Sequence, residues 1–189
     1  MRMSLVESLR ALHAVRTSEV VLTTMGSARE WMKLGSHPLD FVYAPSAMGE
    51  ATAVALGLAL AQPARKVIAC NGDGCMLMNL GSLVTIAASQ PKNLLLIVFA
   101  NGIYEVTGGQ QTAGQHVNFG DVARGCGLSS VHEFRALDAW KAALPDLLNS
   151  AGPTFVTLHV APVTGGDVPK SPAPPIARAK AFAQALQAR

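Results

Sequence analysis

Hydrophobic residues recur along this chain with two spacings that alternate from one end to the other. Short apolar runs typical of buried strands are separated by stretches in which apolar residues return every three or four positions, the spacing of a helix. The expected strands are 19–23, 41–43, 67–70, 94–100, 129–132 and 154–160. The expected helices are 4–15, 28–34, 49–61, 76–89, 121–126, 137–150 and a last one from Ile176.

Strict alternation of strand and helix is typical of a parallel sheet whose crossover helices cover both faces. We therefore predict an α/β fold, a single doubly wound domain with a mostly parallel six-stranded sheet. Residues 162–175 are rich in proline and glycine and predict an extended arm. The expected organisation is a domain at 1–165, followed by a C-terminal arm and helix at 166–189.

The composition adds an expectation about the surface. Of the 189 residues, half are hydrophobic and only 14% are charged. A chain of this length can build one sizeable core. So few charges suggest that part of its surface is covered by another subunit. The alternative is an unusually alanine-rich monomer.

The distribution of charge and cysteine argues against several kinds of partner and location. The formal charge of +3 is spread along the chain without Lys/Arg clusters. Nucleic acid is therefore not expected, whereas a small anionic ligand is compatible. Residues 1–15 predict a capped amphipathic helix rather than a signal peptide, and no stretch is apolar enough to span a membrane. Cys70, Cys75 and Cys126 show no metal-binding spacing, which favours a reducing, cytoplasmic location.

The residues that carry chemistry follow two neighbouring strands at the centre of the chain. The third expected strand ends in an Asn-Gly-Asp-Gly turn at 71–74, and the fourth ends on Asn-Gly at 101–102. Sequential parallel strands place their carboxyl ends at one edge of the sheet, so Asp73 and Asn101 should converge there. Two hard oxygen donors beside the NH groups of a glycine turn suit a Mg²⁺ ion that also holds diphosphate oxygens. The alternative is a doubly wound domain with two ordinary turns.

The order Gly-Asp-Gly, helix, apolar strand, Asn-Gly resembles the diphosphate and metal motif of thiamine diphosphate enzymes. This resemblance implies thiamine diphosphate and Mg²⁺ as cofactors. It makes the side chains of Asp73 and Asn101 and the backbone carbonyl of Ile103 the metal ligands. It also adds turn residues to the cofactor site: Gly72, Gly74 and Cys75. The family often has Asn-Asn where this chain has Ala100 and Asn101, so one asparagine is missing while the ligand position is kept.

Two further stretches gain a role from the same resemblance. In thiamine diphosphate decarboxylases a bulky apolar residue bends the cofactor into a V, and Met48 matches it. The backbone carbonyl of Ser46 is then expected to hold the aminopyrimidine amino group. Ser27, after the first expected strand, matches a diphosphate-binding hydroxyl. The residues alone allow simpler interpretations, with Met48 as filler on a packing helix and Ser27 as a helix cap.

The polar, glycine-rich segment 104–112 predicts a wall of the substrate pocket or, alternatively, an ordinary surface loop. Its sequence resembles phosphonopyruvate decarboxylases and the β subunit of sulfopyruvate decarboxylase. Thr107 lies where pyruvate decarboxylases carry a catalytic glutamate. Thr107 and Gln110 are therefore expected to donate hydrogen bonds to the substrate's anionic end or to the reaction intermediate. Roles for Glu105 and His116 stay open, and a lone histidine is more often structural.

The family's activating glutamate belongs to a separate pyrimidine-binding domain, and no residue here matches it. Five glutamates fall away from any matching motif: Glu7, Glu19, Glu30, Glu50 and Glu133. We therefore expect half of a carbon–carbon lyase, which decarboxylates a small anionic 2-oxo acid such as sulfopyruvate. Activity should require a pyrimidine-binding α-type subunit that carries the glutamate. Alone, the chain is expected to form a homodimer.

Two other functions fit the same cofactor domain. The chain can be the thiamine diphosphate-binding subunit of a 2-oxo acid oxidoreductase that passes electrons to iron–sulfur clusters, although its three cysteines offer no cluster motif. It can also be a non-catalytic thiamine diphosphate-binding paralogue. The complete set of expected metal ligands argues against this last interpretation.

Overall fold

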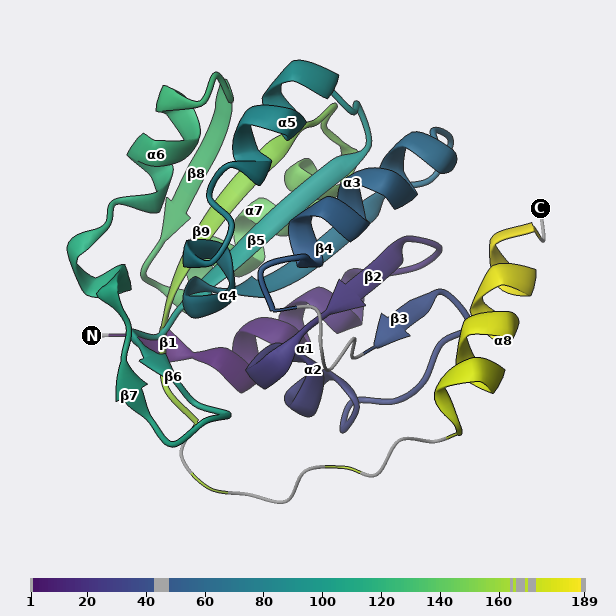
Figure 1. Ribbon diagram of the computed structural model, residues 1–189, viewed down its shortest axis with the longest axis horizontal. Coiled ribbons are helices and arrows are strands. Elements are labelled where there is room, and N and C mark those ends of the chain that lie inside the picture. The colour runs from purple at the N-terminus through teal and green to yellow at the C-terminus, as the bar shows by residue number, and fades with distance from the viewer. Residues whose placement is uncertain (1, 43–47, 164, 166–168, 170–172, 188–189) are drawn as a thin grey trace.

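A parallel sheet runs through the middle of the protein, with helices on both of its faces (Figure 1). The computed structural model describes residues 2–42, 48–163, 165, 169 and 173–187. The sheet strands are β1 (Met3–Ser4), β2 (Val20–Thr23), β3 (Asp40–Val42), β4 (Val67–Gly72), β5 (Leu94–Ala100), β8 (Ser130–Phe134) and β9 (Thr154–Ala161). Their order is β1-β9-β5-β4-β2-β3, with β8 also paired to β9, and every pairing is parallel. The predicted α/β class and the six predicted strands are confirmed.

One strand was not predicted. The two residues of β1 pair with the end of β9, Met3 opposite Val160 and Ser4 opposite Ala161, and make the sheet seven-stranded. Two residues are too short to carry an alternating pattern, so hydrophobic spacing cannot reveal such a strand. The pairing fixes the amino-terminal residues beside the carboxyl end of β9.

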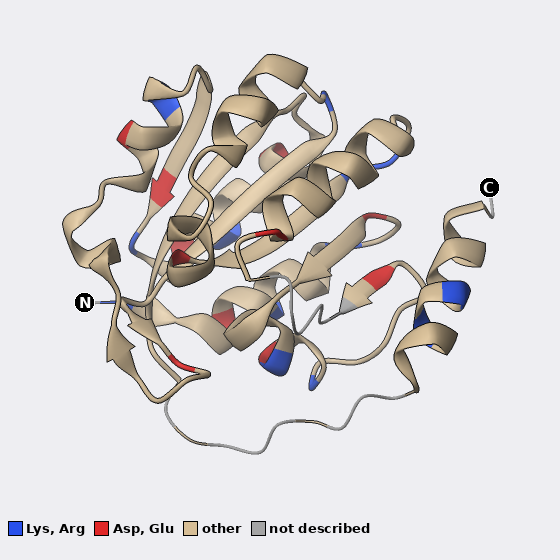
Figure 2. Ribbon diagram, in the orientation of Figure 1, with Lys and Arg blue, Asp and Glu red and all other residues tan. Residues whose placement is uncertain are grey.

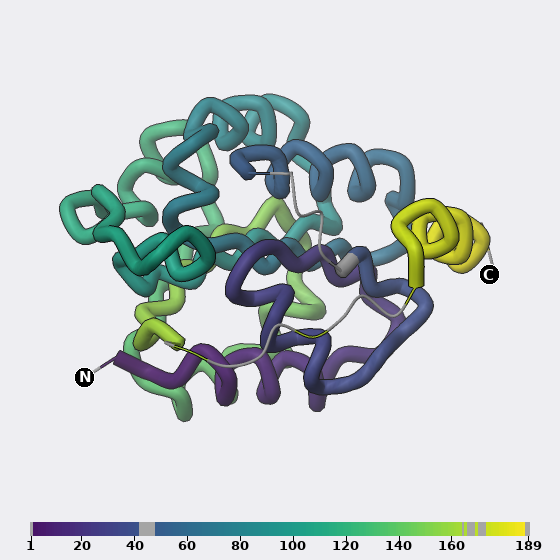
Figure 3. Tube along the Cα trace, turned by 60° about the horizontal axis from the view of Figure 1, so that its bottom comes forward, coloured from purple at the N-terminus to yellow at the C-terminus, as the bar shows by residue number. Residues whose placement is uncertain are grey.

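The helices divide between the two faces of the sheet. They are α1 (Leu5–Val15), α2 (Met25–Trp31), α3 (Ala51–Ala61), α4 (Asp73–Leu77), α5 (Ser82–Ser89), α6 (Phe119–Gly125), α7 (Leu137–Asn149) and α8 (Pro175–Gln187), with a 3₁₀ turn η1 (Ala113–His116). One core cluster joins the sheet to α3, α4, α5 and α6, and the other joins it to α1, α2 and α7. Figure 3 shows these layers above and below the sheet.

The central strand β5 explains why the sheet is buried on both sides. Its seven residues are all buried, and they alternate between the two clusters: Leu94, Leu96 and Val98 face one, Leu95, Ile97 and Phe99 the other. A strand covered on both faces has no polar side, which is why its sequence is a continuous apolar run.

One local expectation needs correction. The single helix predicted over 76–89 is two helices, because Met78–Gly81 forms a turn in which the Ser82 hydroxyl donates to the Asn79 carbonyl at 2.7 Å. Asparagine, glycine and serine favour such turns over a helix interior. The segment expected to be a pocket wall or surface loop also takes part in a short antiparallel pair that was not predicted, β6 (Ile103–Tyr104) with β7 (Gln110–Gln111).

The C-terminal helix packs against the domain. Phe182 of α8 is buried in the core beside the ring of Phe41, with ring centroids 5.0 Å apart. The Arg65 guanidinium also donates to the carbonyls of Ala185 and Leu186. Among the described residues, no helix combines the length and hydrophobicity needed to cross a membrane. Charged positions are sparse along the ribbon in Figure 2, as the 14% charged composition requires.

Candidate functional site

The strand order locates a crevice before any side chain is considered. The chain leaves β2 toward β3 on one side and leaves β4 toward β5 on the other, so the connections diverge between β2 and β4. Ligands of open parallel sheets bind beyond the carboxyl ends of strands at such a point. A cavity of about 470 Å³ lies here, lined by residues that follow β2, β4 and β5. Its volume falls within the range of small-molecule and cofactor pockets.

Asp73, the first residue after β4, lies in the wall of this cavity and is 2% exposed. One carboxylate oxygen accepts from the backbone NH of Gly74 at 2.7 Å. The other accepts from the backbone NH of Gly102 at 2.7 Å and from the Thr112 hydroxyl at 3.3 Å. Burial raises the pKa of the Asp73 carboxyl, and these donors oppose that rise. The carboxylate is therefore held in place by three donors, and a carboxylate so positioned suits a cation ligand.

Asn101 directly follows β5. The predicted approach of this strand end to Asp73 is made by Gly102, the residue after Asn101. The NH of Gly102 donates to Asp73, and the Asn101 side-chain oxygen accepts from the NH of Ile103 at 2.9 Å. The side-chain nitrogen donates to Glu105 at 2.9 Å. All three predicted metal-ligand residues, Asp73, Asn101 and Ile103, line the same cavity. The convergence of the two strand ends is therefore present.

The donor chemistry fits the expected cofactor. A carboxylate, an amide oxygen and a peptide carbonyl are hard oxygen donors of the kind Mg²⁺ prefers. Among the described residues, no group of three or more His, Cys, Asp or Glu side chains is placed to hold a metal ion. Gly72 lines the cavity, and a Cβ there would meet nothing within 4 Å. Open space therefore borders the turn whose NH groups were expected to hold diphosphate.

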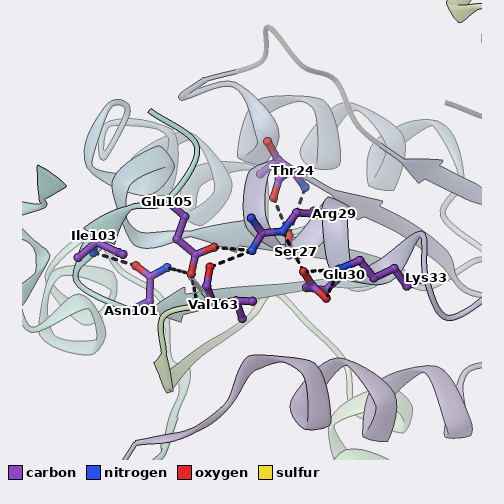
Figure 4. A network of polar contacts seen from close by, with 9 residues as sticks. All are labelled: Thr24, Ser27, Arg29, Glu30, Lys33, Asn101, Ile103, Glu105 and Val163. Atoms are coloured by element: carbon purple, nitrogen blue, oxygen red, sulfur yellow. Dashed lines mark hydrogen bonds and ion pairs between the residues drawn. The ribbon is translucent and has the colours of Figure 1, made fainter. Parts of the chain in front are cut away.

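Glu105 forms the centre of a network that the sequence left open (Figure 4). Its side chain is only 3% exposed. One carboxylate oxygen accepts from the Asn101 amide at 2.9 Å and from the NH of Val163 at 2.7 Å. The other lies 3.4 Å from the Arg29 guanidinium, which also donates to the Val163 carbonyl. The network connects three segments: the loop at 101–105 after β5, helix α2 and the segment after β9.

The carboxylate of Glu105 also explains a glycine in α2. A Cβ on Gly26 would lie 2.5 Å from a Glu105 carboxylate oxygen, so only glycine lets the two segments approach this closely. Glu105 also orients the Asn101 amide. The amide nitrogen donates to Glu105, and the amide oxygen accepts from the NH of Ile103. An acidic residue four positions after the second expected ligand was the available signal for this role.

Ser27 lies in the cavity wall, but its hydroxyl is 2.7 Å from the carbonyls of both Cys70 and Thr24. It also accepts from the NH of Thr24, in the capping arrangement that begins α2 at Met25. Both interpretations of Ser27 thus have support: it caps the helix, and it borders the site. Its contact with diphosphate stays a prediction.

The mouth of the cavity is apolar. Met48, Met78 and Val106 line it and are 52%, 50% and 54% exposed. The NH of Gly49 donates to the Cys75 sulfur at 3.2 Å, which joins the segment after Met48 to the turn after β4. Ser46 lies outside the described residues.

The predicted substrate-facing residues lie at the rim. Thr107 and Gln110 line the cavity, are exposed and bond to each other, the Thr107 hydroxyl donating to the Gln110 side-chain oxygen at 3.0 Å. At the buried end of the cavity, which we call its floor and which contains Asp73 and Glu105, the Tyr104 ring covers Gly74 so closely that no Cβ would fit there. His116 does not line this cavity and faces a second pocket instead.

Comparisons with known proteins agree with this geometry. The family described as "Thiamine pyrophosphate enzyme, C-terminal TPP binding domain" matches residues 23–158. Phosphonopyruvate decarboxylase of Streptomyces viridochromogenes is 43% identical over 147 residues, which are 78% of this chain and 36% of that protein. Sulfopyruvate decarboxylase subunit beta of Methanothermobacter thermautotrophicus is 35% identical over 170 residues, 89% of this chain and 88% of that subunit.

A solved structure supports the fold. A Mycobacterium smegmatis protein assigned as thiamin diphosphate-dependent superposes with a TM-score of 0.71 at 23% identity, over 85% of this chain and 32% of that one. The chain also spans only about a third of the phosphonopyruvate decarboxylases that it matches, at 36% and 35% of their lengths. The match to the family profile nevertheless covers most of the chain and includes both strand-end turns. This chain belongs to the family of C-terminal TPP-binding domains of thiamine pyrophosphate enzymes.

Proposed function

We propose that this chain is the diphosphate- and Mg²⁺-binding subunit of a thiamine diphosphate-dependent 2-oxo acid decarboxylase, a lyase that acts on an anionic substrate such as sulfopyruvate. A separate pyrimidine-binding subunit completes the site and supplies the activating glutamate. The observation that carries the proposal is the 35% identity to a sulfopyruvate decarboxylase β subunit over 89% of this chain and 88% of that subunit. That relative is named as a subunit beta, which favours a divided enzyme.

The floor of the cavity would hold the diphosphate end of the cofactor. Asp73, Asn101 and the Ile103 carbonyl would bind Mg²⁺, and the diphosphate would lie beside the turn after β4, where Gly72 borders open space. When bound, thiamine diphosphate supplies the centre that stabilises negative charge on the substrate's former keto carbon. The work of this chain is to anchor and orient that group.

The mouth of the cavity would receive the partner. Met48 and Met78 are each about half exposed although both line the cavity, and apolar surface around a pocket is typical of an interface. Thr107 and Gln110 at the rim carry a hydroxyl and an amide that can donate to a substrate's terminal anion. The partner's glutamate would approach from the side opposite Met48.

Reconstitution tests this proposal. The purified chain, mixed with a pyrimidine-binding subunit, thiamine diphosphate and Mg²⁺, should release CO₂ from sulfopyruvate. Phosphonopyruvate and pyruvate serve as substrates that differ only in their terminal group. An artificial electron acceptor forms a parallel arm, since its reduction without free aldehyde would identify an oxidoreductase instead. Rapid CO₂ release by the chain without any partner would refute the divided enzyme.

The assembly state provides a second test. The isolated chain should be a homodimer by light scattering, because closed two-fold pairs are the commonest assembly. The complete enzyme should bury more than roughly 2,000 Å² at an obligate interface. A stable monomer, in both the presence and absence of the pyrimidine-binding subunit, would contradict this part of the proposal.

A further inference from the structure

A second pocket, of about 390 Å³, lies beside the carboxyl end of β9. It is lined by the amino-terminal residue Arg2, by η1 and the start of α6, by Arg135 just after β8, and by Thr157 and His159 of β9. Asp73 is the one residue that lines both this pocket and the cofactor cavity. The pocket is therefore a separate space, which lies on the other side of Asp73 from the cofactor cavity.

The polar lining of this pocket consists almost entirely of hydrogen-bond donors. Apart from Asp73, every polar side chain in the lining carries an N–H or O–H group: Arg2, Gln115, His116, Asn118, Arg135, Thr157 and His159. Two of these are guanidinium groups, which are always charged. In Figure 2 the blue start of the chain and the blue segment just past β8 lie at the same end of the sheet.

Thr157 provides an independent sign that the pocket can hold a ligand. Its residue is 2% exposed, and its hydroxyl has no hydrogen-bond partner among the described residues. A buried hydroxyl left unpaired is costly, so native proteins rarely retain one. His159 lies two residues further along β9 and thus on the same face of the sheet. Its Nε2 lies 2.8 Å from the Glu133 carboxylate.

The acidic groups near the pocket occupy only part of its donors: the Asn118 amide donates to Asp121 at 2.6 Å, whereas both guanidinium groups keep N–H groups available. Glu133 contacts Arg135 at 2.6 Å, but a guanidinium has five N–H donors and this contact uses one of its nitrogens. Arg2 donates from one nitrogen to the Asn101 carbonyl at 2.6 Å, which holds the side chain in place and leaves its other donors available. Asp73 is turned toward Gly74, Gly102 and Thr112, whose donors it already accepts.

We propose that this pocket binds a small tetrahedral oxyanion of the phosphate, sulfate or sulfonate class. Donors reach it from three separate elements, with Arg2 beside β1, Arg135 after β8 and Thr157 on β9. Donors from several directions match the three or more oxygens of a tetrahedral anion, whereas a carboxylate offers two. The bound anion would lie against Arg2, which contacts the backbone of the metal-loop residue Asn101.

Calorimetric titration of the chain with sulfate tests the proposal. Thr157→Val keeps the shape of the residue and removes the hydroxyl, and it should weaken sulfate binding about tenfold or more. Arg2→Gln should weaken it similarly. Arg124→Gln is the matched control, because Arg124 lies on neighbouring α6 and pairs with Asp121 outside the pocket lining. The control should bind sulfate as the wild-type chain does.

Three further arms identify the ligand and the site. Inorganic phosphate and methanesulfonate separate a free anion from the anionic end of an organic molecule, and acetate tests the tetrahedral requirement. Titration repeated with thiamine diphosphate and Mg²⁺ present excludes binding at the diphosphate site. Thr157→Val should also be at least as thermostable as wild type without anion, since it removes an unpaired buried hydroxyl. Equal sulfate affinity in wild type, Thr157→Val and Arg2→Gln, or no saturable binding, would overturn the proposal.

Discussion

The two ends of the cofactor cavity are built differently. At the floor, the side chains of Asp73 and Glu105 are almost fully buried, and each accepts from two donors contributed by other segments. At the mouth, Met48, Met78 and Val106 are half exposed. The floor is thus organised by this chain alone, whereas the mouth presents side chains that no described segment covers. The difference separates what this chain supplies from what a partner is proposed to add.

Preorganisation of the floor has a physical reason. A metal ligand that must be ordered at the moment of binding costs affinity, so a ligand shell held by fixed neighbours binds more tightly. The Asn101 amide is fixed by Glu105, and the Asp73 carboxylate by Gly74 and Gly102. The apolar side chains at the mouth make no directional bonds, so fixing their orientation does not increase affinity until another surface packs against them.

The largest effect should follow from removing the acid on the floor. Asp73→Ala should weaken Mg²⁺-dependent binding of thiamine diphosphate at least about hundredfold, since loss of a mere supporting residue costs 10–100-fold. Calorimetry of the purified variant measures this. Asp121→Ala, which changes an exposed carboxylate on α6, is the control. Unchanged cofactor affinity in Asp73→Ala would remove the floor from the cofactor site.

The second largest effect should follow from changing Glu105, which supports the floor. Glu105→Gln keeps the shape of the side chain but replaces one carboxylate oxygen with an NH₂ group. If the remaining oxygen accepts from the Asn101 amide and the Val163 NH, the NH₂ group faces the Arg29 guanidinium, and two donors then oppose each other. We expect Mg²⁺ affinity about tenfold weaker, with a lower melting temperature of the chain itself. Glu7→Gln, in an exposed pair with Arg10, should change neither. If Glu105→Gln lowered stability alone, the residue would be structural only.

Much of this architecture can be predicted from the sequence. The continuous apolar run of β5 and the helical spacing of apolar residues in α1 and α7 predict these elements directly, so the α/β class follows from the pattern. Asp73 and Asn101 can be found because each directly follows a buried strand, and parallel strands bring such positions together.

The remainder depends on contacts between distant segments. Glu105 gains its role from Arg29, 76 positions earlier, and from Val163, 58 positions later, and no local pattern reports such pairs. The pocket beside β9 likewise joins Arg2 to Thr157. The break between α4 and α5 was missed because apolar residues keep helical spacing across a turn set by Asn79 and Gly81.

Two glycines sharpen the contrast through folding stability. A Cβ at Gly26 would lie 2.5 Å from the Glu105 carboxylate, while one at Gly57 in α3 would meet nothing within 4 Å. Gly26→Ala should destabilise the chain by about 1–3 kcal/mol, because it displaces a held carboxylate. Gly57→Ala should stabilise it by about 0.5–1 kcal/mol, the usual gain at a helical glycine. Chemical denaturation measures both, and the same sign for both would contradict the close approach at Gly26.

The smallest effect on the isolated chain should come from the mouth. Met48→Ala should change the free energy of unfolding by less than about 0.5 kcal/mol, because the side chain is 52% exposed. Cofactor affinity should also hold, since the floor is untouched. Turnover of the reconstituted enzyme should nevertheless fall, because Met48 is proposed to support the bent cofactor at the point where the partner closes the site. Leu60→Ala, equally exposed on α3 but outside the cavity lining, is the matched control. Wild-type turnover in Met48→Ala would mean that the mouth serves only as surface, and the difference between the two ends would then reflect packing rather than a division of labour between subunits.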